Sequence, residues 1–421
     1  MGTTTTATAT SPNLPWLYAG RALRGVSTAF LTVVFPLYLA ASGYGATRLG
    51  LALSLSGVVT VGLVAVVGWL ADRYGRRTMI LALAALSALG GFALAVFPPA
   101  LPLVVLASGL GGVGRGGGAG SGGAWGPMFP AEQPLVAASA PPDRRVEAFG
   151  RLSFVGVLAA AVGSLLAGLP ALLATHGVPT VTGYRLLFAL AGVLGLGTLA
   201  VTLPIREPLP HPSQDAASDR GVMPFGQLVG RLGLTNALNG FGFGFLGPLL
   251  SYWFYRRFGV GADAIGGLYT VVNLAAALPY LTAARLARRL GEVRTVVWTR
   301  GVSVLVLGLL PLLPSFWWAG LAYTVRMGLN SLGMPARQSF TMRVADERYR
   351  SRVAAFGSLP SQATSMLSPG IGGALMEISV NLPLFAAAFF MLANVVAYAW
   401  AFGRVAPDVS GATRPGAAPP A

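Results

Sequence analysis

The stretch GWLADRYGRR, residues 68–77, places an acid and three arginines between two long apolar segments. About 20 apolar residues suffice to cross a hydrocarbon core of about 30 Å, and both flanking segments reach that length. Charges at such a place can form a solvated turn, a nucleic-acid patch or a working part of a membrane protein. The composition and repeats of the whole chain distinguish these possibilities.

The composition indicates a membrane protein. Of 421 residues, 54% are hydrophobic and only 10% are charged, whereas soluble domains carry about 25% charged residues. Apolar runs separated by Gly, Pro and charge predict the twelve spans 17–42, 46–70, 77–97, 101–126, 146–172, 181–204, 232–256, 262–285, 294–314, 317–341, 351–376 and 382–403. We therefore expect an all-α membrane protein with twelve transmembrane helices.

The distribution of arginine predicts the orientation. The net charge of +16 is compatible with nucleic-acid binding, but the arginines gather in short loops after every second span. These loops hold Arg73, Arg76, Arg77, Arg144, Arg145, Arg206, Arg220, Arg288, Arg289, Arg343, Arg348 and Arg350. The opposite loops hold little beyond Arg48, Arg256 and Arg257. The positive-inside rule then places both termini in the cytoplasm of a multi-pass cell-membrane protein, and no nucleic acid is expected as a partner.

The widest polar gap divides the spans six and six. We expect a disordered N-terminus at 1–15, which lacks the pattern of a cleavable signal peptide, and a disordered tail at 404–421. The six-helix bundles are expected at 16–204 and 232–403, joined by a cytoplasmic linker at 205–231.

The two halves resemble each other in sequence. LADRYG at 70–75 matches LARRLG at 286–291, and FPAEQ at 129–133 matches MPARQ at 334–338. Several matches in the same order at nearly one offset indicate a duplicated six-helix unit with two pseudo-symmetric bundles. Parallel repeats of this kind place a substrate path between the halves, near the middle of the bilayer.

The stretch 68–77 and the arrangement of twelve spans in two related halves together resemble the major facilitator superfamily. The family's loop motif G-x-x-x-D-R-x-G-R-R is matched by Gly68, Asp72, Arg73, Gly75, Arg76 and Arg77. The resemblance covers about residues 17–403 and implies a secondary transporter that works by alternating access. It also implies that Asp72 caps the start of span 351–376 in the other half, and that Arg76 pairs with Glu132.

A second stretch of sequence resembles a motif of the drug/proton antiporter branch of that family. SPGIGGAL at 368–375 resembles the antiporter signature, although it stands in the eleventh span and not in the fifth. Arg115 resembles the arginine of a further motif in the fourth span, but Gly118 and Ala119 stand where glutamine is usual.

The matched acids of the first half are arginines in the second. Asp72 and Glu132 correspond to Arg288 and Arg337, so the halves carry opposite charges at corresponding places. We hypothesise that charge pairs across the halves close the cytoplasmic side in the outward-open state.

Charges deep in the spans are candidates for substrate binding or coupling. Arg115, Arg326 and Arg24 lie inside predicted spans, and Arg21 is interpreted as an interfacial anchor. Of the acids, only Glu132 is expected to be partly buried. The cavity is therefore predicted to be net positive and lined by arginine, which suits anionic or amphipathic solutes in an efflux or exchange carrier.

The alternative is a proton-coupled exporter of hydrophobic or cationic drugs. Its binding residues would be the aromatic side chains Tyr38, Trp253, Tyr269 and Tyr280, for each of which packing toward lipid is the other interpretation. Polar residues that could line the path are Asn236, Asn239, Asn273, Asn330, Gln338 and Gln362. Glu132 is the candidate proton carrier, and facilitated diffusion or anion exchange stays open.

The sequence offers no set of catalytic groups. It contains no Cys, and both His176 and His211 fall in loops. We expect neither an enzyme nor a non-transporting receptor, and no cofactor and no bound metal. The expected partners are a small-molecule substrate, protons as a candidate coupling ion and the lipid bilayer, with the protein as a monomer.

Overall fold

The computed structural model describes residues 12–112, 127–140, 145–207, 224–247, 249–344 and 350–403. These residues form helices and connections, without a strand. The first half contains α1 (Leu14–Ala41), α2 (Ala46–Tyr74), α3 (Arg76–Val96), α4 (Leu101–Gly111), α5 (Phe129–Ser139), α6 (Arg145–Leu166), α7 (Leu169–Ala174) and α8 (Thr180–Thr202). The second half contains α9 (Phe225–Leu246), α10 (Leu250–Phe258), α11 (Ala262–Leu290), α12 (Glu292–Leu309), a 3₁₀ turn (Leu310–Leu312), α13 (Phe316–Val344), α14 (Arg350–Ile378) and α15 (Leu382–Phe402).

Most predicted spans correspond to one helix, and three are divided. Span 146–172 forms α6 and α7, span 232–256 forms α9 and α10, and span 294–314 forms α12 and the 3₁₀ turn. Each division lies beside proline or glycine, which interrupt helical hydrogen bonding. Seven helical segments of the described chain are long and apolar enough to cross a membrane.

The fourth predicted span differs most from the structure. Its helix α4 ends at Gly111, where Gly112 has a positive φ of 67°, and residues 113–126 lie outside the described residues. A further helix, α5, occupies the place where a connection was expected. Local sequence did not reveal α5, because its short apolar run is interrupted by Pro134.

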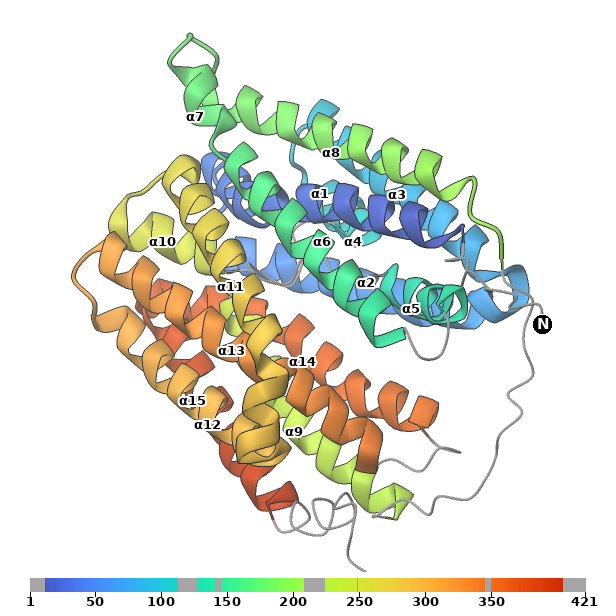
Figure 1. The fold of residues 1–421 in the computed structure, drawn as a ribbon. Coiled ribbons are helices and arrows are strands. Elements are labelled where there is room, and N and C mark those ends of the chain that lie inside the picture. The colour runs from blue at the N-terminus through green and yellow to red at the C-terminus, as the bar shows by residue number, and fades with distance from the viewer. Residues whose placement is uncertain are drawn as a thin grey trace, which may run out of the picture.

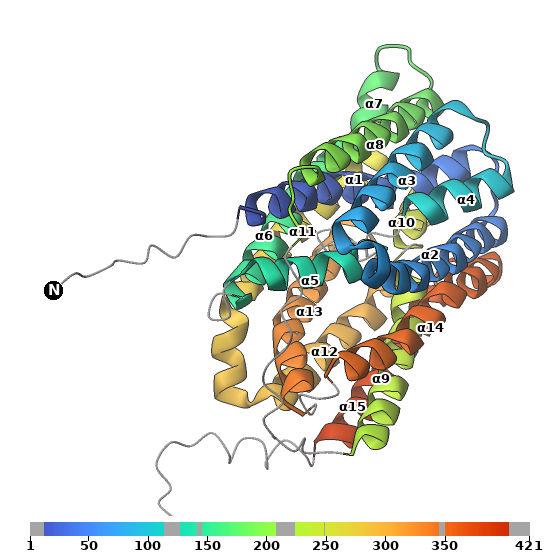
Figure 2. The same cartoon turned by 90° about the vertical axis from the view of Figure 1, so that its right-hand side faces the viewer.

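The helices form two bundles, one from each half of the chain (Figure 1). The bundles contact each other along α2 with α14 and along α6 with α11, on two sides of the molecule (Figure 2). The duplication is visible in the backbone. Gly75 before α3 and Gly291 before α12 adopt the same rare conformation, with φ of 89° and 80° and ψ of 147° and 154°.

The two ends of the molecule differ in their apolar cores. We call the end with Gly75 and Gly291 the Gly75 end, and the opposite end, which carries the connection between α1 and α2, the Tyr44 end. One apolar cluster extends across both bundles and includes Tyr38 and Trp253. Toward the Gly75 end each bundle has its own cluster, around Leu135 in the first and around Phe340 in the second. The halves therefore share their core toward the Tyr44 end and have separate cores toward the Gly75 end.

Small residues allow the halves to approach closely along α2 and α14. A Cβ atom at Gly50 would collide with the carbonyl oxygen of Pro369, and one at Gly373 would collide with that of Ala46. Ser54 accepts a hydrogen bond of 2.7 Å from the backbone N–H of Gly370. The segment 368–375, which resembles the antiporter signature, thus forms a crossing of helices between the halves, where small residues permit close contact.

Candidate functional site

Hydrogen bonds join the halves toward the Tyr44 end. The Glu377 carboxylate, at the end of α14, accepts from the backbone N–H of Thr47 at 3.2 Å, in the first turn of α2. Helix N-termini favour negative charge, so this carboxylate stabilises the contact between the halves. Deeper, Ser251 Oγ donates to the Thr32 carbonyl oxygen at 3.2 Å. Among the described residues, these hydrogen bonds between the halves hold this end closed.

The Gly75 turn carries the signature residues. Glu207 accepts a hydrogen bond of 2.6 Å from the backbone N–H of Arg76, in the first turn of α3. Arg77 donates from Nη2 to the carbonyl oxygen of Leu203 at 2.7 Å. The positive φ of 89° requires glycine at Gly75, and a Cβ atom there would also displace the flexible Glu207 carboxylate from its place. Glu207, which sequence reasoning assigned only to a loop, thus fixes the turn.

The expected pairing of Arg76 with Glu132 is wrong in this conformation. Glu132 binds two arginines of α1 instead, and the described part of the chain gives Arg76 no carboxylate partner for its side chain. Arg73 is exposed, with its guanidinium 5.7 Å from the centre of the Tyr74 ring.

For the other residues of the proposed cytoplasmic gate, the structure gives only the helix on which each lies. Gly68 and Asp72 lie on α2, and Arg288 lies on α11. The side chains of Asp72 and Arg288 are outside the described residues, so the proposed cap by Asp72 stays a prediction.

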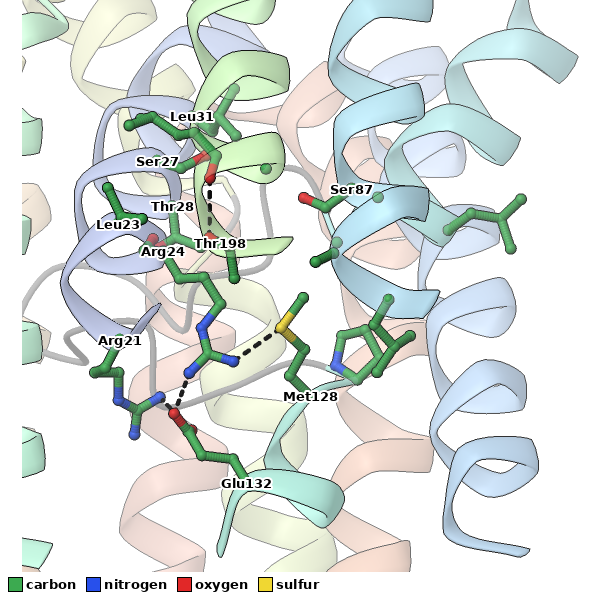
Figure 3. A pocket seen from close by; sticks show the side chains of 18 residues that line it. Arg21, Leu23, Arg24, Ser27, Thr28, Leu31, Ser87, Met128, Glu132 and Thr198 are labelled. Atoms are coloured by element: carbon green, nitrogen blue, oxygen red, sulfur yellow. Dashed lines mark hydrogen bonds and ion pairs between the residues drawn. The ribbon is translucent and has the colours of Figure 1, made fainter. Parts of the chain in front are cut away.

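Three charged side chains meet inside the first bundle (Figure 3). Glu132 of α5 pairs with Arg24 of α1, and its other oxygen lies 3.2 Å from Nη1 of Arg21. Glu132 is 1% exposed and Arg21 is 2% exposed. Arg21 is therefore a buried partner of Glu132, and its interpretation as an interfacial anchor is wrong. Arg24 also donates to the sulfur of Met128 at 2.8 Å.

An open pocket adjoins this cluster of Arg21, Arg24 and Glu132. Its wall includes the hydroxyl side chains Ser27, Thr28, Ser87 and Thr198, from α1, α3 and α8. Figure 3 shows Arg24 directed toward Met128 and Glu132, which lie on the α5 side of the pocket. The space is about 690 Å³, open surroundings included.

The second bundle has a related contact with the charge reversed. Arg337 of α13, the repeat counterpart of Glu132, donates to Asn236 of α9. Nearby, Arg300 of α12 donates from Nη1 to Asn239 at 3.0 Å and to Asn394 of α15 at 3.1 Å. Sequence reasoning missed Arg300, although it stands six residues into a predicted span and was therefore detectable as a charge at depth.

Arg326 lies buried in the same bundle, at 3% exposure. Its guanidinium donates to the sulfur atoms of Met327 and Met391 at 3.4 Å and 3.3 Å and lies 5.8 Å from the centre of the Tyr323 ring. Its Nε has no hydrogen-bond partner in the part of the chain that the structure describes. Thioether sulfur is a weak acceptor, so the described part of the chain gives the buried guanidinium of Arg326 no strong acceptor.

The remaining candidates lie in several places. Tyr38, Tyr269 and Trp253 are fully buried inside the protein, so packing toward lipid is wrong for these three. Tyr38 packs against Tyr184 and Phe188, and Tyr269 accepts a hydrogen bond from Ser251 at 3.1 Å. Asn330 is half-buried on α13. Arg115 and the side chains of Tyr280 and Gln338 lie outside the described residues.

The arrangement can bind charge but offers no catalytic set. Glu132 is the only acid that is buried among the described residues. Buried arginines, in contrast, occur in both bundles. A search of that same part of the chain finds no group of His, Cys, Asp and Glu that could hold a metal ion. The chemistry available is reversible binding of charged groups.

Comparison with known proteins gives one family and many related folds. A family model described as Major Facilitator Superfamily matches residues 17–231 and 232–420. No curated protein sequence matches the chain.

Similar solved structures include three transporters. A bacterial homolog of the human lysosomal transporter Spinster, inward-facing and occupied, has a TM-score of 0.65 at 17% identity, covering 94% of this chain and 97% of that chain. A mutant of the nucleoside transporter NupG has a TM-score of 0.69 at 12% identity, covering 93% of this chain and 100% of that chain. The human organic anion transporter MFSD10 has a TM-score of 0.63 at 16% identity, covering 92% of this chain and 99% of that chain. At these identities the likeness shows the fold.

Proposed function

Because the chain belongs to the Major Facilitator Superfamily, we propose that it moves a small anionic or amphipathic solute across a cell membrane by alternating access, as an efflux or exchange carrier. The family is one of transporters and not of enzymes. We further propose that the protein acts as a monomer, with domains at the boundaries given by the sequence and without a cofactor.

The division of the cores supports alternating access. The halves share a core and hydrogen bonds toward the Tyr44 end, whereas their cores are separate toward the Gly75 end. The described arginines of the basic loops beside Gly75 and Gly291, Arg73, Arg76, Arg77 and Arg289, lie at the Gly75 end, which we place in the cytoplasm together with both termini. On this orientation the conformation faces inward, and transport requires the Tyr44 end to open while the Gly75 end closes.

Arg326 is the observation that supports an anionic cargo. Buried charges in membrane proteins ordinarily face a cavity or a partner, and the described contacts of Arg326 are two thioethers and a ring. Its fork of donors matches a carboxylate or phosphate group in geometry and charge. The excess of buried arginine over buried acid acts in the same direction. Arg115 and Asn330 stay candidates for the same path.

Proton-coupled export of drugs is the second proposal, and Glu132 supports it. This acid is buried beside a pocket, and its pairs with Arg21 and Arg24 would be weakened by protonation. A coupling acid must exchange its proton with both sides in turn. If Glu132→Gln retains full transport driven by a pH gradient, Glu132 is not the coupling group.

Flux into proteoliposomes tests the cargo. The purified protein is reconstituted, and uptake of radiolabelled organic anions, inorganic anions, sugars and hydrophobic cations is compared, with and without an imposed pH gradient. We expect saturable anion uptake that unlabelled anions on the inner side accelerate by exchange. Saturable transport of hydrophobic cations alone, dependent on the pH gradient, would replace the first proposal by the second, and no flux of any solute would contradict both.

The signature acid is proposed to act in the opposite state. Asp72 would close the cytoplasmic side by pairing across the halves when the protein faces outward, opposite Arg288 and Arg337 in the second repeat. Asp72→Asn is then expected to increase the inward-open population. Unchanged labelling of engineered cysteines on both faces would contradict this role.

A further inference from the structure

In the second bundle, the buried Arg300 binds no acid among the described residues, whereas Arg21 and Arg24 of the first bundle bind Glu132. Eight residues separate Arg300 from the start of α12, which places it about 12 Å from the Gly75 end. Arg24 lies ten residues into α1, so about 15 Å from the same end. At this common depth the first bundle has the carboxylate of Glu132, whereas the acceptors bound by Arg300 are the neutral side chains Asn239 and Asn394.

Arg300 is a buried cation without an ion pair in the described part of the chain. It is 8% exposed, and its Nε has no hydrogen-bond partner among the described residues. Two amide oxygens satisfy donors but do not neutralise the charge, and a buried charge without a counter-charge is strongly unfavourable. The site therefore lacks one negative charge.

A second unused donor stands beside Arg300. Tyr398 lies four residues after Asn394 on α15, which places both on the same face of the helix, one turn apart. Its hydroxyl has no hydrogen-bond partner among the described residues, and the side chain is 2% exposed. Tyr398 also lies close enough to Arg300 for an electrostatic interaction. Tyr398 thus offers a buried donor without a described partner, one turn of α15 from the asparagine that Arg300 binds.

Aromatic side chains limit the size of any occupant. The Tyr398 ring packs against Phe340 and Phe402, with ring centres 6.3 Å and 5.0 Å away. Close packing of this kind disfavours a large organic anion more strongly than a small ion.

We propose that Arg300 Nε and the Tyr398 hydroxyl bind a small inorganic anion, chloride in the first instance, beside Asn239 and Asn394, whose amide oxygens accept from Arg300. The anion supplies in the second bundle the negative charge that Glu132 supplies in the first. It is a resident ion and not the cargo. Arg326, the proposed cargo-binding residue, lies further from the Gly75 end, because its carbonyl oxygen accepts a hydrogen bond of 3.4 Å from Ser303, which is about 4.5 Å further along α12 than Arg300.

Thermal unfolding of the full-length protein in detergent tests the site. The unfolding midpoint is followed by intrinsic tryptophan fluorescence while sodium chloride replaces sodium gluconate at constant ionic strength. We expect a saturable rise, on the order of 2 °C at ten times the Kd, with chloride and bromide and not with gluconate or sulfate. Equal midpoints in chloride and gluconate would overturn the proposal.

Variants connect the effect to these residues. Arg300→Gln should remove the chloride effect, and the matched change Arg257→Gln, at an exposed arginine of α10, should retain it. Asn239→Asp places a carboxylate where Arg300 already donates, so it should raise the midpoint in gluconate and abolish the response to chloride. This second variant keeps the test decisive if Arg300→Gln does not fold, and a full chloride response in Asn239→Asp would contradict the site. Stability and not flux is measured, so failure here leaves the proposed transport function untouched.

Discussion

Glu132 of α5 accepts a hydrogen bond from Arg24 of α1 inside the first bundle. At the matching place of the second repeat, Arg337 of α13 donates to Asn236 of α9. Corresponding helices are thus joined at corresponding positions, while the charge of the matched residue is reversed. The duplicated unit retained the contact, and its electrostatics diverged.

The ion pair of Glu132 should contribute strongly to stability. Glu132→Gln leaves the buried Arg21 and the half-buried Arg24 without a carboxylate, so we expect a loss of about 3 kcal/mol in the free energy of unfolding. The double variant Arg24→Gln and Glu132→Gln should lose less free energy of unfolding than the two single variants together, by about 1 kcal/mol or more. Unfolding midpoints of the four proteins check this, and strictly additive losses would contradict a direct pair.

Arg326 should determine the affinity for an anionic solute. A hydrogen bond to a charged group contributes about 1.5–3 kcal/mol, so Arg326→Gln should reduce kcat/KM for anion uptake by about tenfold or more. Arg326→Lys should retain only part of the original kcat/KM, because lysine lacks the planar fork of donors that arginine has. Arg257→Gln serves as the control, and an equal loss in that variant would show a general effect of removing positive charge.

Glu377 should hold the Tyr44 end closed. Glu377→Gln weakens the interaction with the first turn of α2 by about 0.3–1 kcal/mol, which should increase the outward-open population up to about fivefold. The chain contains no Cys, so a single cysteine introduced by Ser251→Cys, at a position buried between the halves, reports opening by its labelling rate.

Glu207→Gln is the matched control for that experiment. Glu207 also accepts from the first turn of a helix, but it lies in the same half as that helix. Its replacement should leave labelling of the introduced cysteine unchanged, and faster labelling in both variants would show loosening that is unrelated to the gate.

The close contact of α2 with α14 should tolerate no added methyl group. Gly50→Ala would bring its Cβ against the backbone of Pro369, so the closed Tyr44 end should lose about 1–3 kcal/mol. Gly62→Ala, on the same helix and with nothing within 4 Å, should have no such effect. Labelling of the Ser251→Cys reporter distinguishes the two, and slow labelling in Gly50→Ala would contradict the predicted collision.

The signature glycine should be more sensitive than its repeat counterpart. Gly75 and Gly291 share a positive φ, which disfavours alanine by about 1–3 kcal/mol at either position. Only at Gly75 would the new Cβ also collide with Glu207, whereas Gly291 has nothing within 4 Å. Gly75→Ala should therefore lower the unfolding midpoint more than Gly291→Ala, and equal midpoints would show that Glu207 moves aside freely.

The sequence by itself determined the class, the number of spans and the division into two related halves. These follow from local properties, because apolar length and the positions of Gly, Pro and Arg depend on transfer into lipid and on helix termination. It also identified Glu132 and Arg326 as charges at depth, since a charge in an apolar run is visible without knowledge of the fold. The same reasoning, applied to every span, would have found Arg300.

Only the tertiary structure decided which charges meet. Arg21 and Arg24, and not Arg76, reach Glu132, because the rotation of α1 and the position of α5 bring those atoms together. The same holds for Glu377 at α2 and for Asn394 and Tyr398 beside Arg300. Contacts between helices distant in sequence depend on how each helix is rotated and on which side of the molecule is closed, and hydropathy is insensitive to both.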